Sequence, residues 1–232
     1  MRRGFFLTFE GLDGSGKSTQ LALLAAFLQQ QGLPILVTRQ PGDTTLGERI
    51  RALLLDAKTT GVAPMAEMAM MFADRAQSIE ERIAPALAEG KVVLCDRFTD
   101  STEAYQGGGR GLGSAAVLAL HRVLCGDVQP EMTILLLPPL AISRARTSSR
   151  TAQAQASTAK GSVAADRFEQ ERLEFHERVH AAYHAIALRE PKRVLCIEGD
   201  PSIEEAQQRI QNAVLDRLRA RGFLQSIFAD RT

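Results

Sequence analysis

A glycine-rich loop near the start of the chain constrains the fold more than any other feature. The pattern G-x-x-x-x-G-K-[ST] occupies residues 11–18, directly after the apolar run 5–9. In such a loop, backbone N–H groups surround phosphate oxygens at the start of a helix, whose dipole adds positive potential. The apolar run predicts a buried strand, and apolar residues at helical spacing over 17–31 predict the helix. The loop therefore predicts a bound nucleoside triphosphate.

The side chains of this loop add to what its backbone offers. Lys17 is expected to reach the outer phosphates, and Ser18 is expected to hold magnesium. The residues expected to contact the triphosphate are Gly11, Leu12, Asp13, Gly14, Ser15, Gly16, Lys17, Ser18 and Thr19. A chance glycine-rich turn is the alternative, and the strand before the loop and the helix after it argue against that alternative.

Charge and composition exclude several classes of protein. The chain has 232 residues, with 28 basic and 27 acidic side chains and a formal net charge of +1. No global field exists to attract nucleic acid, so we expect no nucleic-acid partner. No apolar run approaches the length of a membrane span, so no membrane is expected. Three cysteines without a CxxC pair suit a reducing compartment, and we expect a cytoplasmic protein.

Short apolar segments alternate with amphipathic ones along the whole chain. This alternation predicts a single α/β domain over residues 1–232, with a five-stranded parallel sheet flanked by helices. The strands are expected at residues 5–9, 34–38, 91–95, 132–137 and 193–197. The helices are expected at residues 17–31, 46–55, 64–89, 114–124, 167–188 and 202–221, with Ser202 capping the last. Ligands of such sheets bind at the carboxyl ends of the strands.

One segment in the second half of the chain lacks the pattern of a packed element. Residues 147–165 contain a single large apolar residue, Val163, so the segment buries little and is expected to be mobile. Residues 141–165 contain four cations and no acid. We predict a mobile lid, approximately residues 144–167, that closes over phosphates. A solvated loop with incidental charges is the alternative.

A second polar motif follows the strand expected at residues 91–95. Asp96 lies where a carboxylate that organises magnesium belongs, and Arg97 can hold two phosphates. A structural ion pair between the two residues is the alternative. Since both follow a strand directly, they are expected to point into the ligand cleft.

Five motifs in order resemble one enzyme family. The segments FEGLDGSGKSTQ, TRQPGDTTLGERIRALLL, FADRAQ, DRFTDSTEAYQGGGRG and ADRFEQE, between about residues 4 and 214, closely resemble thymidylate kinase. The resemblance implies the P-loop NTPase fold and phosphorylation of dTMP to dTDP with Mg²⁺ and ATP. It also implies a homodimer formed through helices, for which the Ala- and Met-rich stretch 63–73 offers a surface.

The resemblance also implies roles for single residues. Asp13 matches an acid that contacts the 3′-hydroxyl of dTMP, and Arg51 matches an arginine that holds the dTMP phosphate. Arg75 matches the arginine that bonds the O4 edge of thymine, and Arg97 matches the arginine of a catalytic Asp-Arg-Tyr motif. The remaining matches are Thr102 and Gln106, which read the base, and Tyr105, which crowds the 2′ position and favours deoxyribose.

The phosphate loop itself points to where further catalytic arginines lie. The loop carries Gly14 and no arginine, as in the bacterial subclass whose catalytic arginines come from the lid. Arg146 and Arg150 are then the candidates, and Lys17 and Arg97 complete the catalytic set. In the same family, the loop at residues 198–201 contacts adenine.

Several positions depart from the family pattern. Gln40 replaces a glutamate, Phe98 replaces a tyrosine, and the lid is about a dozen residues longer. The thymine-stacking phenylalanine is replaced by Met71, with Phe72 beside it. Adjacent helix residues point about 100° apart, so Phe72 can stack on the base only if the helix is shifted or bulged. Met71 can stack through its polarizable sulfur.

Two other functions remain open at this point. A kinase for dUMP or a modified pyrimidine nucleotide is favoured by Met71. A phosphate-loop protein that binds nucleotide without turnover is favoured by the lost acids, since the Asp-x-x-Pro-Glu pattern of the family has Leu135 and Pro139 in its acidic positions. Arg51 and Arg75 also have a structural alternative as solvent-facing helix residues, with Glu48 three residues before Arg51 as its partner.

Overall fold

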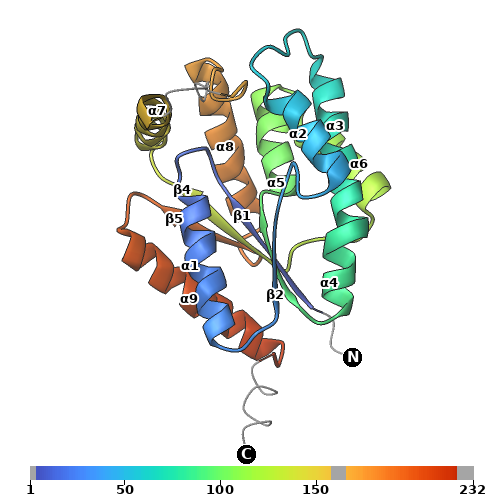
Figure 1. Ribbon diagram of the computed structural model, residues 1–232, viewed down its shortest axis with the longest axis vertical. Helices are drawn as coiled ribbons and strands as arrows, with labels where there is room; N and C mark the ends of the chain where they lie inside the picture. Colours follow the sequence, from blue (N-terminus) through green and yellow to red (C-terminus); the bar gives the residue numbers. More distant parts are fainter. Residues whose placement is uncertain (1–3, 158–165, 224–232) are drawn as a thin grey trace, which may run out of the picture.

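A parallel sheet of five strands forms the centre of the molecule (Figure 1). The computed structural model describes residues 4–157 and 166–223. The strands lie in the order β2-β3-β1-β4-β5, and every neighbouring pair is parallel. Their bounds are β1 Phe5–Glu10, β2 Ile35–Arg39, β3 Val92–Asp96, β4 Met132–Leu137 and β5 Val194–Glu198. Each lies within one residue of its predicted range, so the predicted fold class is confirmed.

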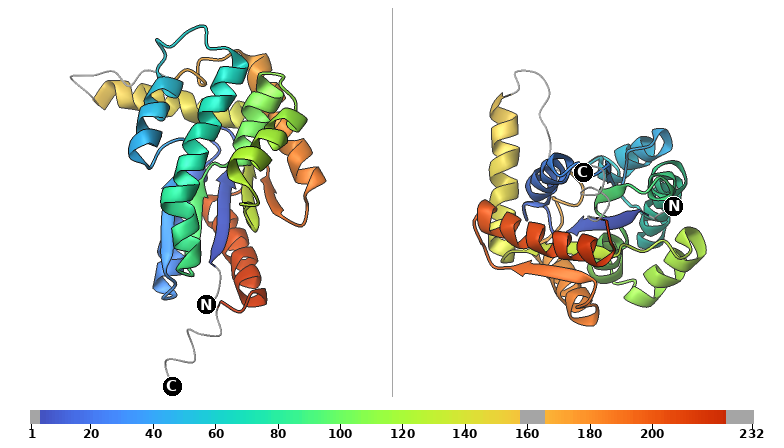
Figure 2. Two further views of the ribbon diagram at one scale, coloured as in Figure 1. Left: turned by 90° about the vertical axis from the view of Figure 1, so that its right-hand side faces the viewer. Right: turned by 90° about the horizontal axis from the view of Figure 1, so that it is seen from below.

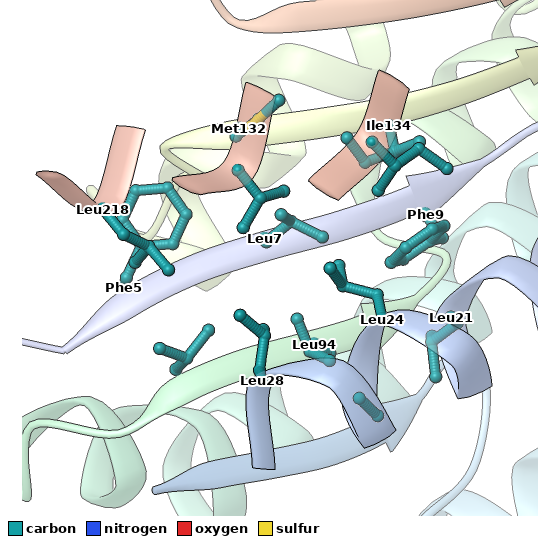
Figure 3. Packing of buried hydrophobic residues seen from close by; sticks show 14 of the residues in the cluster. Phe5, Leu7, Phe9, Leu21, Leu24, Leu28, Leu94, Met132, Ile134 and Leu218 are labelled. Atoms are coloured by element: carbon teal, nitrogen blue, oxygen red, sulfur yellow. The ribbon is translucent and has the colours of Figure 1, made fainter. Parts of the chain in front are cut away.

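The side chains of the central strand β1 point alternately to the two faces of the sheet, and each face has its own hydrophobic core. Phe5, Leu7 and Phe9 pack on one face against helices α1 (Lys17–Gln30) and α9 (Ile203–Ala220) (Figure 3). Phe6 points to the other face, because successive strand residues alternate sides. Two phenylalanine-rich layers therefore fix β1, and with it the loop that follows β1.

Further helices cover the second face of the sheet. Helices α3 (Pro64–Ser78) and α6 (Ser114–Cys125) pack on Phe6, and α8 (Leu173–Arg189) packs on β4 and β5. Helix α2 (Thr45–Leu55) packs on α3, outside this layer. The cap predicted for α9 is confirmed, since Ser202 Oγ accepts from the Glu205 N–H and Glu205 reaches back to the Ser202 N–H.

The long helix predicted over residues 64–89 is interrupted. A π-helical segment, η1 (Ile79–Ile83), separates α3 from α4 (Ala84–Ala88). A π turn holds one extra residue and shifts the register of the residues after it. The segment begins after Arg75, so the spacing of Met71, Phe72 and Arg75 is that of a regular α-helix.

The polar segment predicted to be a mobile lid, for which no helix was expected, is helical in its first part. Helix α7 (Leu140–Ser157) continues through residue 157, and residues 158–165 lie outside the described ranges. The prediction counted only large apolar residues, but alanine, arginine and glutamine favour helix without them. Figure 2 shows α7, in yellow, projecting from the body at the end where the strands finish. Helix α8 begins at Leu173, later than predicted.

Two short elements after β3 were not predicted as helices. Helix α5 (Thr99–Thr102) continues into a π segment, η2 (Glu103–Gly109), which packs closely on α8. None of the helices within residues 4–157 and 166–223 combines the length and apolar character needed to cross a membrane.

Candidate active site

The loop between β1 and α1 takes the conformation that its glycines allow. Gly11 and Gly14 have φ values of 135° and 77°, which side chains with a Cβ disfavour. A Cβ on Gly14 would lie 2.2 Å from the backbone oxygen of Ser143 in α7. Glycine is therefore required both for the turn and for the close approach of α7 to the loop.

Lys17 stands at the first turn of α1 and is almost fully buried, with 6% of its side chain exposed. Its Nζ donates to the carbonyl oxygen of Leu12 at 2.8 Å and lies 3.9 Å from the Asp13 carboxylate. Burial, together with the nearby Arg97 guanidinium, lowers the pKa of Lys17 to about 8. An anion placed beside this ammonium would favour its charged form.

Ser18 and Asp96 supply oxygen atoms to one point beside the loop. Ser18 Oγ lies 3.4 Å from Asp96 Oδ2, and Asp96 Oδ1 is buried with no hydrogen-bond partner in the described part of the chain. Hydroxyl and carboxylate oxygens are the ligands that Mg²⁺ prefers, usually one or two beside nucleotide phosphates. Residues 4–157 and 166–223 hold no group of three or more His, Cys, Asp or Glu side chains that could cage a metal. The oxygen set therefore fits magnesium that is shared with a nucleotide.

The phosphate loop opens into a cleft of about 680 Å³. Its walls include α7 and residues 199–201, the loop at which the resemblance places adenine. The cleft is lined by most of the predicted triphosphate contacts, namely Asp13, Gly14, Ser15, Gly16, Lys17, Ser18 and Thr19. Gly11 and Leu12 are buried at its base and do not line it.

A narrower cavity of about 90 Å³ lies between α3, η2 and residue Phe168. The predicted base-site residues that line it are Met71, Arg75, Thr102, Tyr105 and Gln106. Ser101 and Thr102 precede Tyr105 and Gln106 by four residues, so one helical face brings all four to the cavity.

Phe72 does not line this cavity. Its side chain is fully buried in the core beside Phe6 and Phe98, about 100° around α3 from Met71. The prediction that Phe72 contacts the base is therefore corrected, because the only bulge in the described part of this helix comes after Arg75. Met71 faces the cavity.

Five residues line both the cleft and the narrower cavity, and so mark where the two spaces meet. They are Asp13, Gln40, Arg51, Arg97 and Asp166. Two arginines and two carboxylates thus lie among the residues at this junction. The junction is where the phosphates of two ligands would approach each other.

Arg97 organises the junction. Its Nη2 donates to Asp13 Oδ1 at 2.5 Å, its Nη1 donates to the Gly11 oxygen at 3.0 Å, and its guanidinium lies 5.2 Å from the centre of the Tyr105 ring. Burial raises the pKa of Asp13, but Arg97 and Lys17 outweigh burial and hold that pKa well below its usual range. Arg97 and Asp13 are therefore a charged pair within reach of both spaces.

Arg75 is buried among neutral acceptors. It donates to Gln40 Oε1 at 2.9 Å, to the Phe98 oxygen at 3.0 Å and to Thr102 Oγ1 at 2.9 Å. Its Nη1 is buried and has no partner in residues 4–157 and 166–223. The alternative of a solvent-facing helix residue is wrong for Arg75, since only 2% of it is exposed.

Arg51 also differs from its structural alternative. It donates to the carbonyl oxygen of Pro41 at 2.8 Å, whereas Glu48 accepts from Arg39 at 2.7 Å. The expected Glu48 partner is therefore taken by another arginine. Burial lowers the pKa of Arg51 from its ordinary value, as does the neighbouring Arg39 guanidinium.

Both candidate arginines of the lid line the cleft and are held by carboxylates. Arg146 donates to Asp200 at 2.6 Å, and Arg150 donates to Glu169 at 2.7 Å. Both arginine side chains are about half exposed or more, at 47% and 63%. Ion pairs with this exposure are weak, so the arginines are available to other anions.

Sequence reasoning gave no role to several residues that line the site. Arg39 lies at the end of β2, and the rule that found Asp96 at a strand end applies to it too. Gln40 follows Arg39 and is noted in the sequence only as a departure from the family pattern. Asp166 and Phe168 lie within the motif ADRFEQE, but nothing in their spacing indicated that the segment before α8 would reach the cavity.

Comparison with known proteins shows which family the chain matches. The family model for thymidylate kinase matches residues 9–210. The chain is 47% identical to the thymidylate kinase of Solidesulfovibrio magneticus over 209 residues, which are 90% of this chain and 98% of that protein. It is 42% identical to the thymidylate kinase of Geobacter sulfurreducens over 94% of this chain and all of that protein.

A solved structure extends the comparison to the fold. The crystal structure of thymidylate kinase from Ehrlichia chaffeensis is 30% identical and matches with a TM-score of 0.70, covering 92% of this chain and 99% of that chain. This chain belongs to the thymidylate kinase family. It is an ATP-dependent nucleoside monophosphate kinase that phosphorylates dTMP to dTDP. The resemblance noted in the sequence is therefore confirmed, and a binding protein without enzymatic activity is not supported.

Proposed function

We propose that the cleft holds ATP with Mg²⁺, that the narrower cavity holds dTMP, and that the phosphates of the two nucleotides meet at the junction. One observation carries this proposal: Asp13, Arg51 and Arg97 line both spaces. A donor and an acceptor bound end to end would place their phosphates between the two arginines. This is the geometry that phosphoryl transfer requires.

On the ATP side, the loop glycines and Lys17 would hold the outer phosphates. Ser18 and Asp96 would hold magnesium, which when bound neutralises phosphate charge and orients the triphosphate. The loop at residues 199–201 lines the far end of the cleft and would contact adenine.

On the dTMP side, each residue has a place that suits one part of the nucleotide. Arg51 and Arg97 would bind the acceptor phosphate, and Asp13 would accept a hydrogen bond from the 3′-hydroxyl. Tyr105 would crowd the 2′ position. The base would lie on Met71, with the remaining contacts from Arg75, Thr102 and Gln106.

The chemistry needs charge neutralisation more than proton transfer. The acceptor phosphate is already largely ionised at neutral pH, so no general base is required. Lys17 and Arg97 would neutralise the charge that spreads over the transferred group. Exclusion of water from the junction would keep water from acting as the acceptor.

The lid adds the remaining positive charge. We expect residues 144–167 to close over the triphosphate, bringing Arg146 and Arg150 to the transferred group as catalytic arginines. Closure would exchange their carboxylate partners, Asp200 and Glu169, for phosphate oxygens. The exchange costs little, since both arginines are exposed.

The assembly and compartment complete the proposal. We expect a homodimer through α2 and α3, where Leu46, Leu53 and Met65 are 45%, 55% and 52% exposed and α2 packs on α3. A cytoplasmic location is expected because Cys95, Cys125 and Cys196 are all free thiols.

The end-to-end arrangement is tested with a single molecule in which adenosine and thymidine are joined by a chain of phosphates. It should compete with both ATP and dTMP, and it should bind at one molecule per chain. Competition with only one of the two nucleotides would contradict the proposal. Assays with dTMP, dUMP, UMP, dCMP and dGMP would show whether Met71 relaxes the preference for thymine.

A further inference from the structure

A buried carboxylate lies behind the base cavity without lining it. Glu67 is fully buried on α3, and its Oε1 accepts from Gln106 Nε2 at 2.8 Å. Gln106 lines the cavity, whereas Glu67 does not. We propose that Glu67 is a positioning residue that fixes the polarity of the Gln106 amide, and through it the choice of pyrimidine. This inference rests on the proposed placement of the base in this cavity.

Two arginines contact the Glu67 carboxylate, so that both of its oxygens serve as hydrogen-bond acceptors. Arg110 Nε donates to Oε1 at 3.0 Å and Arg110 Nη2 donates to Oε2 at 3.0 Å. Arg167 Nη1 lies 2.8 Å from Oε2. Guanidinium N–H groups only donate, so both oxygens of this carboxylate act as hydrogen-bond acceptors. The partner that Gln106 offers to it must therefore be the NH₂ group.

This constraint leaves one end of the Gln106 amide for the cavity. Because Nε2 is turned to Glu67, the carbonyl Oε1 is the end of the amide that a ligand can meet in the cavity that Gln106 lines. The opposite orientation would place Oε1 against the Glu67 carboxylate, with two acceptors facing each other. A buried pair of that kind is strongly unfavourable.

The cavity therefore presents an acceptor and a donor in fixed places. Gln106 Oε1 accepts, and the unpartnered Arg75 Nη1 donates. The edge of thymine is complementary, with a donor at N3–H beside an acceptor at O4. Cytosine has the opposite pattern, with an acceptor at N3 beside an amino group at C4. Glu67 therefore disfavours a base with an N3 acceptor, because it turns the Gln106 carbonyl oxygen toward N3. Arg75 contacts position 4 of the base independently of Glu67.

A nucleotide with an N3 acceptor and no amino group at C4 separates a mismatch at N3 from a mismatch at position 4. The 5′-monophosphate of the pyrimidin-2-one deoxyriboside has an N3 acceptor and only hydrogen at C4, so it does not oppose Arg75. The experiment measures kcat and KM for this nucleotide and for dTMP, with saturating ATP. The unmodified protein should prefer dTMP by at least about a hundredfold in kcat/KM, since a mismatch leaves buried polar groups unpaired.

Glu67→Gln is the decisive variant. The amide that it introduces can donate as well as accept, so the Gln106 amide is free to turn and offer Nε2 to an N3 acceptor. The preference for dTMP should narrow about tenfold or more, mostly through KM, and kcat/KM for the pyrimidin-2-one nucleotide should rise in absolute terms. If Glu67 had only a structural role, the variant would lower kcat/KM for both nucleotides by the same factor and leave their ratio unchanged. That result would overturn the proposal.

Glu171→Gln is the matched control. Glu171 accepts from Arg110 Nη1 at 2.5 Å in the same network and is 25% exposed, but it has no contact with Gln106. This variant removes one carboxylate from Arg110 and should leave the substrate ratio as it is. If Glu171→Gln lowered the preference for dTMP as much as Glu67→Gln does, the effect would come from general destabilisation of the ion-pair network. That result would overturn the role of Glu67.

A second variant decides the matter if Glu67→Gln does not fold, as judged by its circular dichroism and thermal melting. Gln106→Leu leaves Glu67 with both arginines and removes the amide. A smaller preference for dTMP over the pyrimidin-2-one nucleotide supports the proposal, and full retention of the preference overturns it. If the unmodified protein does not distinguish the two nucleotides, the placement of the base in this cavity fails, and the role of Glu67 fails with it.

Discussion

The two halves of the active site are built from different parts of the chain. The cleft that we propose for the triphosphate is formed in large part by the contiguous loop 11–18, whose backbone N–H groups would make many of the ligand contacts. The base half is assembled from side chains of α3, α5 and η2, with Gln40 arriving from the end of β2. The geometry of a site built from backbone groups is set once the loop folds. The geometry of a site built from side chains also depends on the residues that hold those side chains in place. We therefore expect catalytic power to be concentrated in the first half and substrate choice in the second.

The largest expected effect tests the triphosphate half. Lys17→Ala should lower kcat by about a thousandfold or more, because it removes the buried ammonium beside the transferred phosphates. KM for dTMP should change little. Steady-state kinetics with each nucleotide varied in turn measures both quantities.

A matched control separates this effect from loss of any surface charge. Lys91 pairs with Glu89 at the opposite end of the sheet, and Lys91→Ala should leave kcat unchanged. If a folded Lys17→Ala protein kept the kcat of the unmodified protein, the phosphate loop would have no role in catalysis.

The second prediction concerns the base half. Arg75→Lys should lower kcat/KM for dTMP by about a hundredfold, since a lysine cannot satisfy Gln40, Phe98 and Thr102 while also donating to the base. KM for ATP should stay within about twofold, because Arg75 does not line the cleft. An equal loss of ATP affinity would show that the two halves are not separable as described.

The third prediction follows from the pKa of Lys17, which burial and Arg97 lower to about 8. The ammonium is charged below this pH and loses its proton above it. The value of kcat/KM for ATP reports the free enzyme, so it should fall about tenfold per pH unit above about pH 8. Bound phosphates favour the charged form, so kcat should decline only at higher pH. A kcat/KM profile that stays flat to about pH 10 would contradict the charge assigned to Lys17.

The smallest expected effect tests the lid. Asp200→Asn removes the partner of Arg146 and should change KM for ATP only about twofold, because exposed ion pairs contribute about 0–1 kcal/mol. Steady-state kinetics with ATP varied at saturating dTMP measures the change. Arg146→Ala should instead lower kcat, as expected of a catalytic arginine. A large effect of Asp200→Asn with none of Arg146→Ala would assign the pair to structure alone.

Much of this site was available from sequence because strand ends and loop motifs are local. The apolar run 5–9 and the glycines after it placed the phosphate loop, and the strand-end rule placed Asp96 and Arg97. The same rule extends to Arg39 at the end of β2. Helix α7 was missed because its alanines, arginines and glutamines favour helix without a large apolar face.

The sequence by itself determined the α/β architecture, the order of the strands along the chain, the phosphate loop and the candidate arginines, because strand alternation, helix spacing and glycine-dependent turns are properties of short segments. Only the tertiary structure decided that Met71 and not Phe72 faces the cavity, and that Glu67 lies behind Gln106. Both depend on which side of α3 packs on the sheet and which side faces η2. That choice is made by contacts between segments far apart in the chain, where burial of apolar surface outweighs any local preference.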